Sequence, residues 1–489
     1  MRAATDRQAA SSPFLWALLG ELLAKGMPAL LLLALTHWLA PSAMGIALLT
    51  AAVVSLAQVL AEAGLGRALV MQPAEIPEQS TSVFWINVAF SVVLCLALII
   101  AAPFIATAFG AAEVAAAIRV QSLGIPVIAA AGVHLALMQK HLRFRALAVV
   151  RGIGSITPLL VALPMAIAGY GYWSLVTGAL VGAAAQTLSA VFAERWRPRR
   201  PLALRQALPL LRYGFWITTE VTLGWSLLWL DALLVGGALG LTALGVYRTG
   251  SQIALLLFGV TLGSMLPVYF AQFAALRARP ADLARSVVRA NQAFVLIGVP
   301  LALALWFGSR LGVDLAMGDG WQQTAIVLAW IGLSQGMAWS VSANIEALKA
   351  SGHARLTAGL VALSLAVYAM TLAIAATYGL ESAARARCLA TIILLPMHWL
   401  IAARMLGIPL RMQMAAQLPL FAAGLAAFAA GQFVAHNVQL EETMSGAGDI
   451  LAITTALLAY ALLAWRSTKQ WLRDGRSIET APNQSIFPA

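Results

Sequence analysis

Apolar segments long enough to cross a lipid bilayer recur along almost the entire chain. A transmembrane helix needs about 20 mostly apolar residues. Segments of this kind lie near residues 14–37, 43–61, 82–109, 116–138, 146–168, 172–193, 213–236, 250–272, 290–309, 322–345, 356–378, 382–403, 414–436 and 449–465. Of the 489 residues, 61% are hydrophobic and only 10% are charged, whereas soluble proteins carry about 25% charged residues. The sequence therefore predicts an all-α, polytopic membrane protein with about 14 transmembrane helices.

The first apolar run, from Phe14 to Ala40, contains two charged residues, Glu21 and Lys25. A charge near the bilayer centre costs roughly 2.5 to 3.5 kcal/mol on insertion scales, so each of them needs a partner or a function. The run is too long and too charged for a cleaved secretion signal, and further membrane segments follow it. We therefore expect a retained first helix.

Several classes of function are disfavoured by what the sequence contains. The two cysteines, Cys95 and Cys388, lie far apart in apolar runs, and the six histidines have no metal-site spacing. We find no GxxxxGK[ST] loop, so ATP is not expected to be the direct energy source. The net charge of +12 is attributed to cytoplasmic loops rather than to nucleic-acid binding. We expect no metal, no cofactor and no nucleic-acid partner.

The Lys and Arg residues are distributed unevenly between the two ends of the predicted helices. With the N-terminus in the cytoplasm, most of them fall in cytoplasmic connections. The outer ends then hold only Arg119, Arg248, Arg310, Arg385 and Arg387. Because Lys and Arg resist translocation, this asymmetry predicts the orientation. An even number of helices then places both termini in the cytoplasm.

Two pairs of short segments indicate an internal repeat. The stretch LAPSAMGI (39–46) matches LGLTALGV (239–246), and AIAGYGYWS (166–174) matches AIAATYGLES (373–382). Each predicted copy has six helices, so both copies begin on the same side of the membrane. Such a parallel repeat is related by a pseudo-two-fold axis along the membrane normal.

The repeat predicts three parts of the chain. Residues 1–203 form an N-terminal lobe, 204–410 a C-terminal lobe, and 411–489 two extra helices with a cytoplasmic tail. Two such lobes generally enclose a site near the bilayer midplane, and rocking of one against the other gives alternating access.

Three stretches resemble a known family. They are AEAGLGRALVMQPAEIPEQSTSVFWINVAF (61–90), ALMQKHLRFRAL (136–147) and the run from Leu211 to Leu255, which begins LRYGFWITTE. They are similar to the polysaccharide transporter family, the Wzx-type lipid-linked oligosaccharide flippases of the multidrug/oligosaccharidyl-lipid/polysaccharide export superfamily. The similarity extends over roughly residues 14 to 410.

The resemblance implies two six-helix lobes around a central cavity and transfer of undecaprenyl-diphosphate-linked repeat units, for exopolysaccharide or lipopolysaccharide synthesis. It also implies a multi-pass protein of the bacterial inner membrane, surrounded by membrane lipid. We expect a monomer that works beside polymerase or export proteins. The coupling ion, proton or sodium, stays open.

Three alternatives compete with a flippase. An ion-coupled drug or metabolite antiporter of the same superfamily would prefer acidic cavity residues. A membrane-embedded polymerase or ligase usually needs a sizeable periplasmic loop with catalytic residues, and the predicted outer connections are short, so we expect no enzyme activity. A scaffold without transport would leave the intramembrane charges unexplained.

Five cations are candidates for holding the diphosphate, because Lys and Arg side chains bind phosphate oxygens. They are Lys25, Arg151, Arg248, Arg385 and Arg387. Arg151 shares one helix face with Gly154, Ser155 and Pro158, a small polar face that suits a cavity lining. Arg385 is also spaced to pair with Glu381 one turn earlier.

Three acids are candidates for ion coupling: Glu21, Glu220 and Asp231. Protonation of such a group would release the phosphate from its neighbours. Two of the acids have a simpler alternative. Glu21 lies four residues before Lys25, the favourable order for an ion pair, and Asp231 is placed to form an interhelical bond or pair, for example with Arg248.

Overall fold

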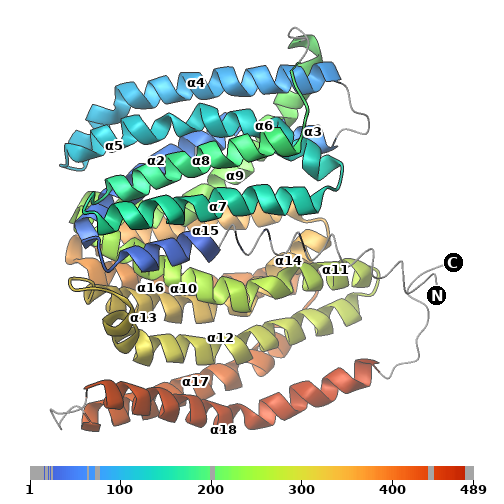
Figure 1. Ribbon diagram of the computed structural model, residues 1–489. Helices are drawn as coiled ribbons and strands as arrows, with labels where there is room; N and C mark the ends of the chain where they lie inside the picture. Colours follow the sequence, from blue (N-terminus) through green and yellow to red (C-terminus); the bar gives the residue numbers. More distant parts are fainter. Residues whose placement is uncertain are drawn as a thin grey trace, which may run out of the picture. The chain divides into compact units, whose positions relative to one another are not determined.

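The computed structural model describes residues 16, 20, 23, 26–62, 65–71, 77–198, 204–438 and 445–479 (Figure 1). Every regular element within these residues is a helix. Thirteen helices of the described chain are long and apolar enough to cross a membrane. The first predicted span is described as a shorter apolar helix, Gly26–Leu35. The prediction of an all-α, multi-span membrane protein is confirmed.

The helices follow one another with short connections. Those before residue 240 are α2 (Pro41–Glu62), α3 (Leu65–Met71), α4 (Pro77–Ala108), α5 (Glu113–Ser122), α6 (Gly124–Lys140), α7 (Phe144–Ile167), α8 (Trp173–Ala193) and α9 (Leu204–Leu239). The later ones are α10 (Leu241–Thr261), α11 (Leu266–Leu276), α12 (Pro280–Ala316), α13 (Gln323–Ala338), α14 (Ser342–Ala350), α15 (Ala354–Ala375), α16 (Leu380–Leu406), α17 (Leu410–Val438) and α18 (Ser445–Glu479).

Several helices extend beyond the predicted spans. The span predicted near 290–309 belongs to α12, which has 37 residues. Its first turns carry Arg285 and Arg289 on one side and the buried Leu283 and Val287 on another. Hydropathy identifies only the part of a helix that lies in lipid, whereas an amphipathic helix continues past the bilayer with its charges in water.

The chain divides into two compact units. Unit 1 contains residues 1–249, 316–321 and 372–380, and unit 2 contains 250–315, 322–371 and 381–489. The helices from α2 to α9, with the first half of α10, belong to unit 1.

In unit 1 the start of α2 crosses the start of α10 at very close range. A Cβ added to Gly45 would lie 1.9 Å from the carbonyl oxygen of Leu241, and one added to Gly245 would lie 2.0 Å from that of Pro41. These four residues are equivalent in pairs in the predicted repeat, at an offset of 200. A contact in which each copy offers the same positions to the other is what two-fold symmetry generates. Only glycine fits here.

Helices α7 and α8 are packed through small residues. A Cβ on Gly154 would lie 2.8 Å from the side chain of Gln186, and one on Gly182 would lie 2.6 Å from the ring of Pro158. The small face of α7 predicted to line a cavity therefore packs on α8 at Gly154 and Pro158, and that part of the prediction is wrong. The prediction failed because small residues at this spacing occur both on helix faces that pack on a neighbouring helix and on faces that line a water-filled cavity.

Unit 2 has an apolar core threaded by a chain of buried amides. The amide of Asn291 donates to the Oδ1 of Asn344 at 2.8 Å, and that of Asn344 donates to the Oε1 of Gln413 at 3.3 Å. All three side chains are buried. Buried amides are costly unless they are hydrogen-bonded, so this chain fixes how α12, α14 and α17 pack.

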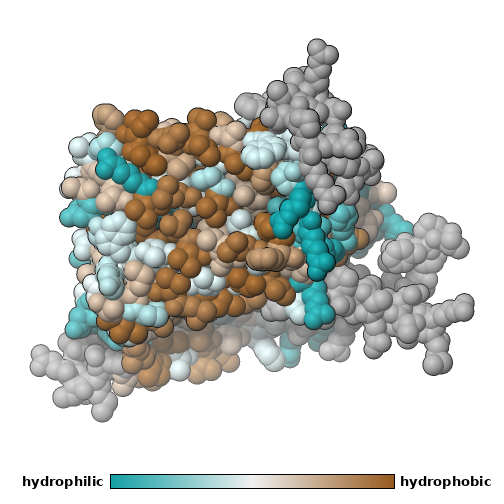
Figure 2. Space-filling view, turned by 45° about the horizontal axis from the view of Figure 1, so that its top comes forward, coloured by the Kyte–Doolittle hydropathy of each residue, from teal (hydrophilic) through white to brown (hydrophobic). Residues whose placement is uncertain are grey.

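The outer surface is rich in apolar side chains. The face seen in Figure 2 is dominated by hydrophobic residues, with hydrophilic side chains gathered toward its edges. Large exposed apolar residues include Phe104, Phe192, Phe433 and Leu462. Apolar surface of this extent is characteristic of a membrane-facing protein.

Candidate functional site

The predicted site residues fall in different parts of the structure. Glu21 and Lys25 lie outside the described residues. Glu220 lies on the backbone of α9, but its side chain is outside the described part. Asp231 of α9 belongs to unit 1. Four of the five candidate cations can be placed: Arg151 and Arg248 lie in unit 1, and Arg385 and Arg387 lie in unit 2.

The end of α9 and the start of α10 form a tight hairpin around Asp231. The two helices are separated only by Gly240, whose φ of +87° is accessible at low cost to glycine. The backbone N–H of Ala232 donates to Oδ1 of Asp231 at 2.8 Å, and the hydroxyl of Tyr247 lies 3.3 Å from Oδ2. The interhelical bond given as the alternative for Asp231 is therefore present, with Tyr247 as a donor.

Arg248 lies deeper in its helix than predicted. The sequence placed it before a span that begins near residue 250, whereas α10 begins at Leu241 and the Arg248 side chain is 1% exposed. Its Nη1 donates to the carbonyl oxygen of Leu228 at 2.7 Å, and its guanidinium lies 4.1 Å from the centre of the Trp229 ring. The prediction of an outer-end position was wrong because α9 ends in a single-residue turn that hydropathy does not register.

The hydroxyl of Tyr247 is expected to make a small but measurable contribution to the free energy of unfolding. Tyr247→Phe removes a long hydrogen bond to the buried Asp231, so we expect the free energy of unfolding to fall by about 1 kcal/mol at most. Thermal unfolding of the detergent-purified protein measures this. Tyr170→Phe, at an exposed tyrosine between α7 and α8, is the matched control. Equal midpoints for both variants would contradict the assignment.

In unit 2, both arginines predicted to begin a helix do lie in α16 rather than in an outer loop. Arg385 forms the predicted ion pair with Glu381, and its guanidinium lies 5.3 Å from the ring centre of Trp330. The guanidinium of Arg387 lies 5.4 Å from the ring centre of Tyr368. Both cations are thus placed over aromatic faces, which attract them through the ring quadrupole.

A group of hydroxyls lies beside Arg387. The Thr391 hydroxyl is 2.9 Å from that of Ser334 and 3.1 Å from that of Tyr368. These side chains come from α13, α15 and α16, so no spacing in the sequence identifies them as one group. Ser334 and Thr391 are buried, and the Thr391 hydroxyl also donates to the carbonyl oxygen of Arg387 at 3.0 Å. These hydrogen bonds join the three helices where they pack.

Arg151 is half-buried in α7, and its carbonyl oxygen accepts the hydroxyl of Ser155 at 2.8 Å. No cluster of three or more His, Cys, Asp or Glu side chains suited to a metal is found among the described residues.

Comparison with known proteins identifies the family. A sequence model of the family described as "Polysaccharide biosynthesis protein" matches residues 34–326, more than half of the chain. The chain belongs to this family. The resemblance to the polysaccharide transporters of the multidrug/oligosaccharidyl-lipid/polysaccharide export superfamily is thereby confirmed.

Relatives of this polysaccharide biosynthesis family member are transport and biosynthesis proteins. The chain is 26% identical over 338 residues to the succinoglycan biosynthesis transport protein ExoT of Rhizobium meliloti (strain 1021), covering 69% of this chain and 68% of ExoT. It is 24% identical over 290 residues to the lipopolysaccharide biosynthesis protein WzxC of Escherichia coli (strain K12), covering 58% of each chain. The chain is a transporter of polysaccharide biosynthesis.

The fold has a solved counterpart. The inward closed conformation of the lipid II flippase MurJ superposes with a TM-score of 0.73 at 14% identity, covering 94% of this chain and 100% of MurJ. The family member described here therefore shares its fold with MurJ.

Proposed function

We propose that the chain moves undecaprenyl-diphosphate-linked oligosaccharide repeat units across the bacterial inner membrane for exopolysaccharide or lipopolysaccharide synthesis. The observation that carries this proposal is the family match over residues 34–326, combined with a fold shared with a lipid II flippase. The names of ExoT and WzxC, which refer to succinoglycan transport and lipopolysaccharide biosynthesis, support the same substrate class.

The polar headgroup travels through a hydrated, cationic cavity by alternating access, while the prenyl chain stays in lipid. Charged and sugar groups cannot cross the hydrocarbon core without such a path, because desolvating them costs many kcal/mol. Lys25, Arg151, Arg385 and Arg387 hold the diphosphate. Arg248, which is almost fully buried in the hairpin of α9 and α10, contributes its positive potential from within the helix pair.

Release of the diphosphate is coupled to an ion. Glu21, Glu220 and Asp231 are the groups that take up and give back a proton, or bind sodium, as the cavity changes its access. A proton that crosses about 100 mV contributes about 2.3 kcal/mol, which is enough to bias the direction of the cycle. Both termini lie in the cytoplasm in this proposal, as the distribution of Lys and Arg predicts.

Deletion of the gene separates transport from synthesis. We expect lipid-linked repeat units to accumulate on the cytoplasmic leaflet while the exported polymer disappears. Mass spectrometry of extracted prenyl-linked oligosaccharides measures the first result, and assay of polymer in the culture medium measures the second. A deletion strain that lacks the lipid-linked repeat unit altogether would indicate a role in synthesis, and a strain with normal polymer and altered drug efflux would indicate an antiporter.

A further inference from the structure

One face of α7 is an apolar ridge with an arginine at its end. Arg145, Val149, Ile153, Ile156 and Leu160 are spaced by three or four residues, which places them on a single side of the helix. From Arg145 to Leu160 the ridge extends about 22 Å at 1.5 Å per residue, more than the ~15 Å of hydrocarbon in one leaflet. Val149 is 51% exposed and Leu160 is 67% exposed, so the ridge faces outward from unit 1.

Two cavities flank this ridge and share Val149 and Ile153. One, of about 690 Å³, lies against α8 and is also lined by Ser189 and by Phe192, which is 74% exposed. The other, of about 380 Å³, is also lined by Trp16 and Leu23. Their walls are almost entirely apolar. The ridge therefore separates two apolar furrows, which have Val149 and Ile153 as their shared wall.

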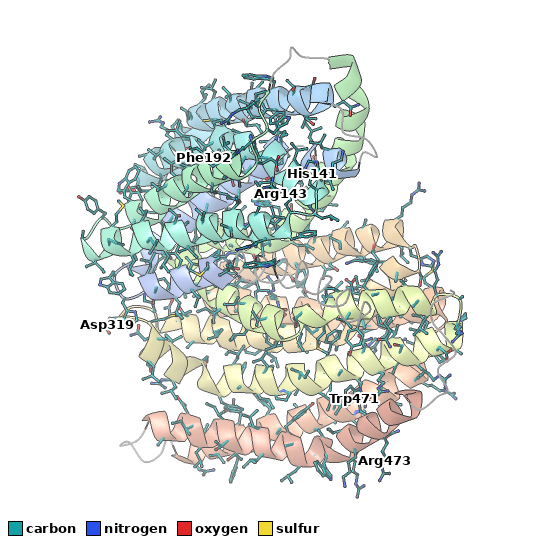
Figure 3. The ribbon with its side chains drawn as sticks, turned by 45° about the vertical axis from the view of Figure 1, so that its right-hand side comes forward. His141, Arg143, Phe192, Asp319, Trp471 and Arg473 are labelled. Carbon is teal, nitrogen blue, oxygen red and sulfur yellow. The ribbon has the colours of Figure 1, made fainter. Side chains whose placement is uncertain are left out.

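The end of the ridge is strongly cationic. Residues 140–145 and 194–197 include five basic side chains and one acid, Glu194. Arg143 already uses that acid, because its Nη1 donates to Glu194 at 2.6 Å and its Nη2 to the Ala193 carbonyl at 3.0 Å. Figure 3 shows Arg143, His141 and Phe192 in the same part of unit 1.

Arg145 is the cation of this end that lies on the ridge itself and beside its cavities. It lies at the mouth of the larger cavity, and its guanidinium is 5.6 Å from the ring centre of Trp16. Among the described residues no carboxylate forms an ion pair with it. A guanidinium supplies five N–H donors in a planar fork that matches phosphate oxygens.

We propose that this face of unit 1 is a binding site for a diacyl anionic phospholipid of the predicted cytoplasmic leaflet. Its phosphate binds Arg145, and its two acyl chains lie in the two furrows on either side of Val149 and Ile153. Two furrows that meet beneath one cation fit a headgroup with two chains, whereas a prenyl phosphate has one chain. The proposal does not rest on the proposed transport function.

Photocrosslinking tests the site directly. The purified full-length protein is placed in phosphatidylcholine nanodiscs with a trace of phosphatidylglycerol that carries a diazirine in one acyl chain, and the adducts are mapped by peptide mass spectrometry. We expect adducts in residues 146–160 and 189–193. Arg145→Gln lowers their yield about tenfold, the effect of one lost charge-assisted contact to phosphate. Ile153→Trp, which fills the shared wall, lowers it as well.

Arg285→Gln is the matched control, because Arg285 is exposed and lies in unit 2, where it pairs with Asp282. Its yield is expected to equal that of the unmodified protein. Diazirine phosphatidylcholine with the same chains is expected to label these peptides weakly in every variant. The proposal is overturned if the Arg145→Gln or Ile153→Trp protein is labelled normally. It is also overturned if phosphatidylcholine labels as well as phosphatidylglycerol, or if a prenyl monophosphate displaces the probe more effectively than phosphatidylglycerol does.

Discussion

Replacing Gly45 or Gly245 with valine is expected to prevent the protein from reaching its stable fold. An added Cβ would lie 1.9 Å from the Leu241 carbonyl oxygen or 2.0 Å from that of Pro41, and both are backbone atoms that cannot rotate away. Overpacking of a rigid contact costs typically 1 to 3 kcal/mol and sometimes more, so we expect about 3 to 5 kcal/mol for either variant. Fluorescence-detected size exclusion after heating measures the loss.

Gly224→Ala is the control for this experiment. Gly224 is in the interior of α9, and a Cβ there would meet no atom within 4 Å. Because alanine is favoured over glycine in a helix by roughly 0.5 to 1 kcal/mol, this variant is expected to be at least as stable as the unmodified protein. If Gly45→Val and Gly245→Val behave like Gly224→Ala, the close crossing of α2 and α10 is incorrect.

Reversing the charge of Lys25 or Arg151 is expected to stop polymer export. Two unit charges about 4 Å apart interact by about 4 kcal/mol at an effective dielectric constant of 20. Lys25→Glu or Arg151→Glu turns an attraction for the diphosphate into a repulsion, so export should fall by at least about 100-fold. Polymer in the culture medium is measured at equal levels of inserted protein.

Two control variants test whether the loss of export is caused by the reversed charge at this position. Arg151→Lys keeps the charge and is expected to retain most of the export, and Arg285→Glu reverses a charge on the exposed Arg285 of unit 2 and is expected to leave export unchanged. Normal export by correctly inserted Lys25→Glu and Arg151→Glu proteins would remove the basis for a cationic path.

Hydropathy was sufficient to predict the helices, because each apolar run of about 20 residues has only one way to satisfy its backbone in lipid. Helix ends were less well predicted. The amphipathic start of α12 carries Arg285 in a helix that extends beyond the predicted span, and α10 begins nine residues earlier than the span at 250 indicated. Charges interrupt a hydropathy signal without interrupting a helix.

The local features of the candidate site were predictable, and its contacts across helices were not. The pair of Glu381 with Arg385 follows from a four-residue spacing within one helix. The hydroxyls of Ser334, Tyr368 and Thr391 come from three helices, and their meeting depends on how those helices pack. For the same reason the small face at Gly154 was assigned to a cavity, although α8 covers it.

Transport by the purified protein shows whether this chain alone moves a lipid-linked oligosaccharide across a bilayer. The purified chain is reconstituted into proteoliposomes that carry an undecaprenyl-diphosphate-linked oligosaccharide with a fluorescent terminal sugar, and an impermeant glycosidase is added outside. Without flipping, the glycosidase digests only the substrate in the outer leaflet. We expect the unmodified protein to expose nearly all of the substrate to digestion. The Arg151→Glu protein is expected to leave the half in the inner leaflet protected. If the inner-leaflet half stays protected in proteoliposomes with correctly reconstituted, unmodified protein, under an ion gradient of either sign, the proposed transport function is contradicted.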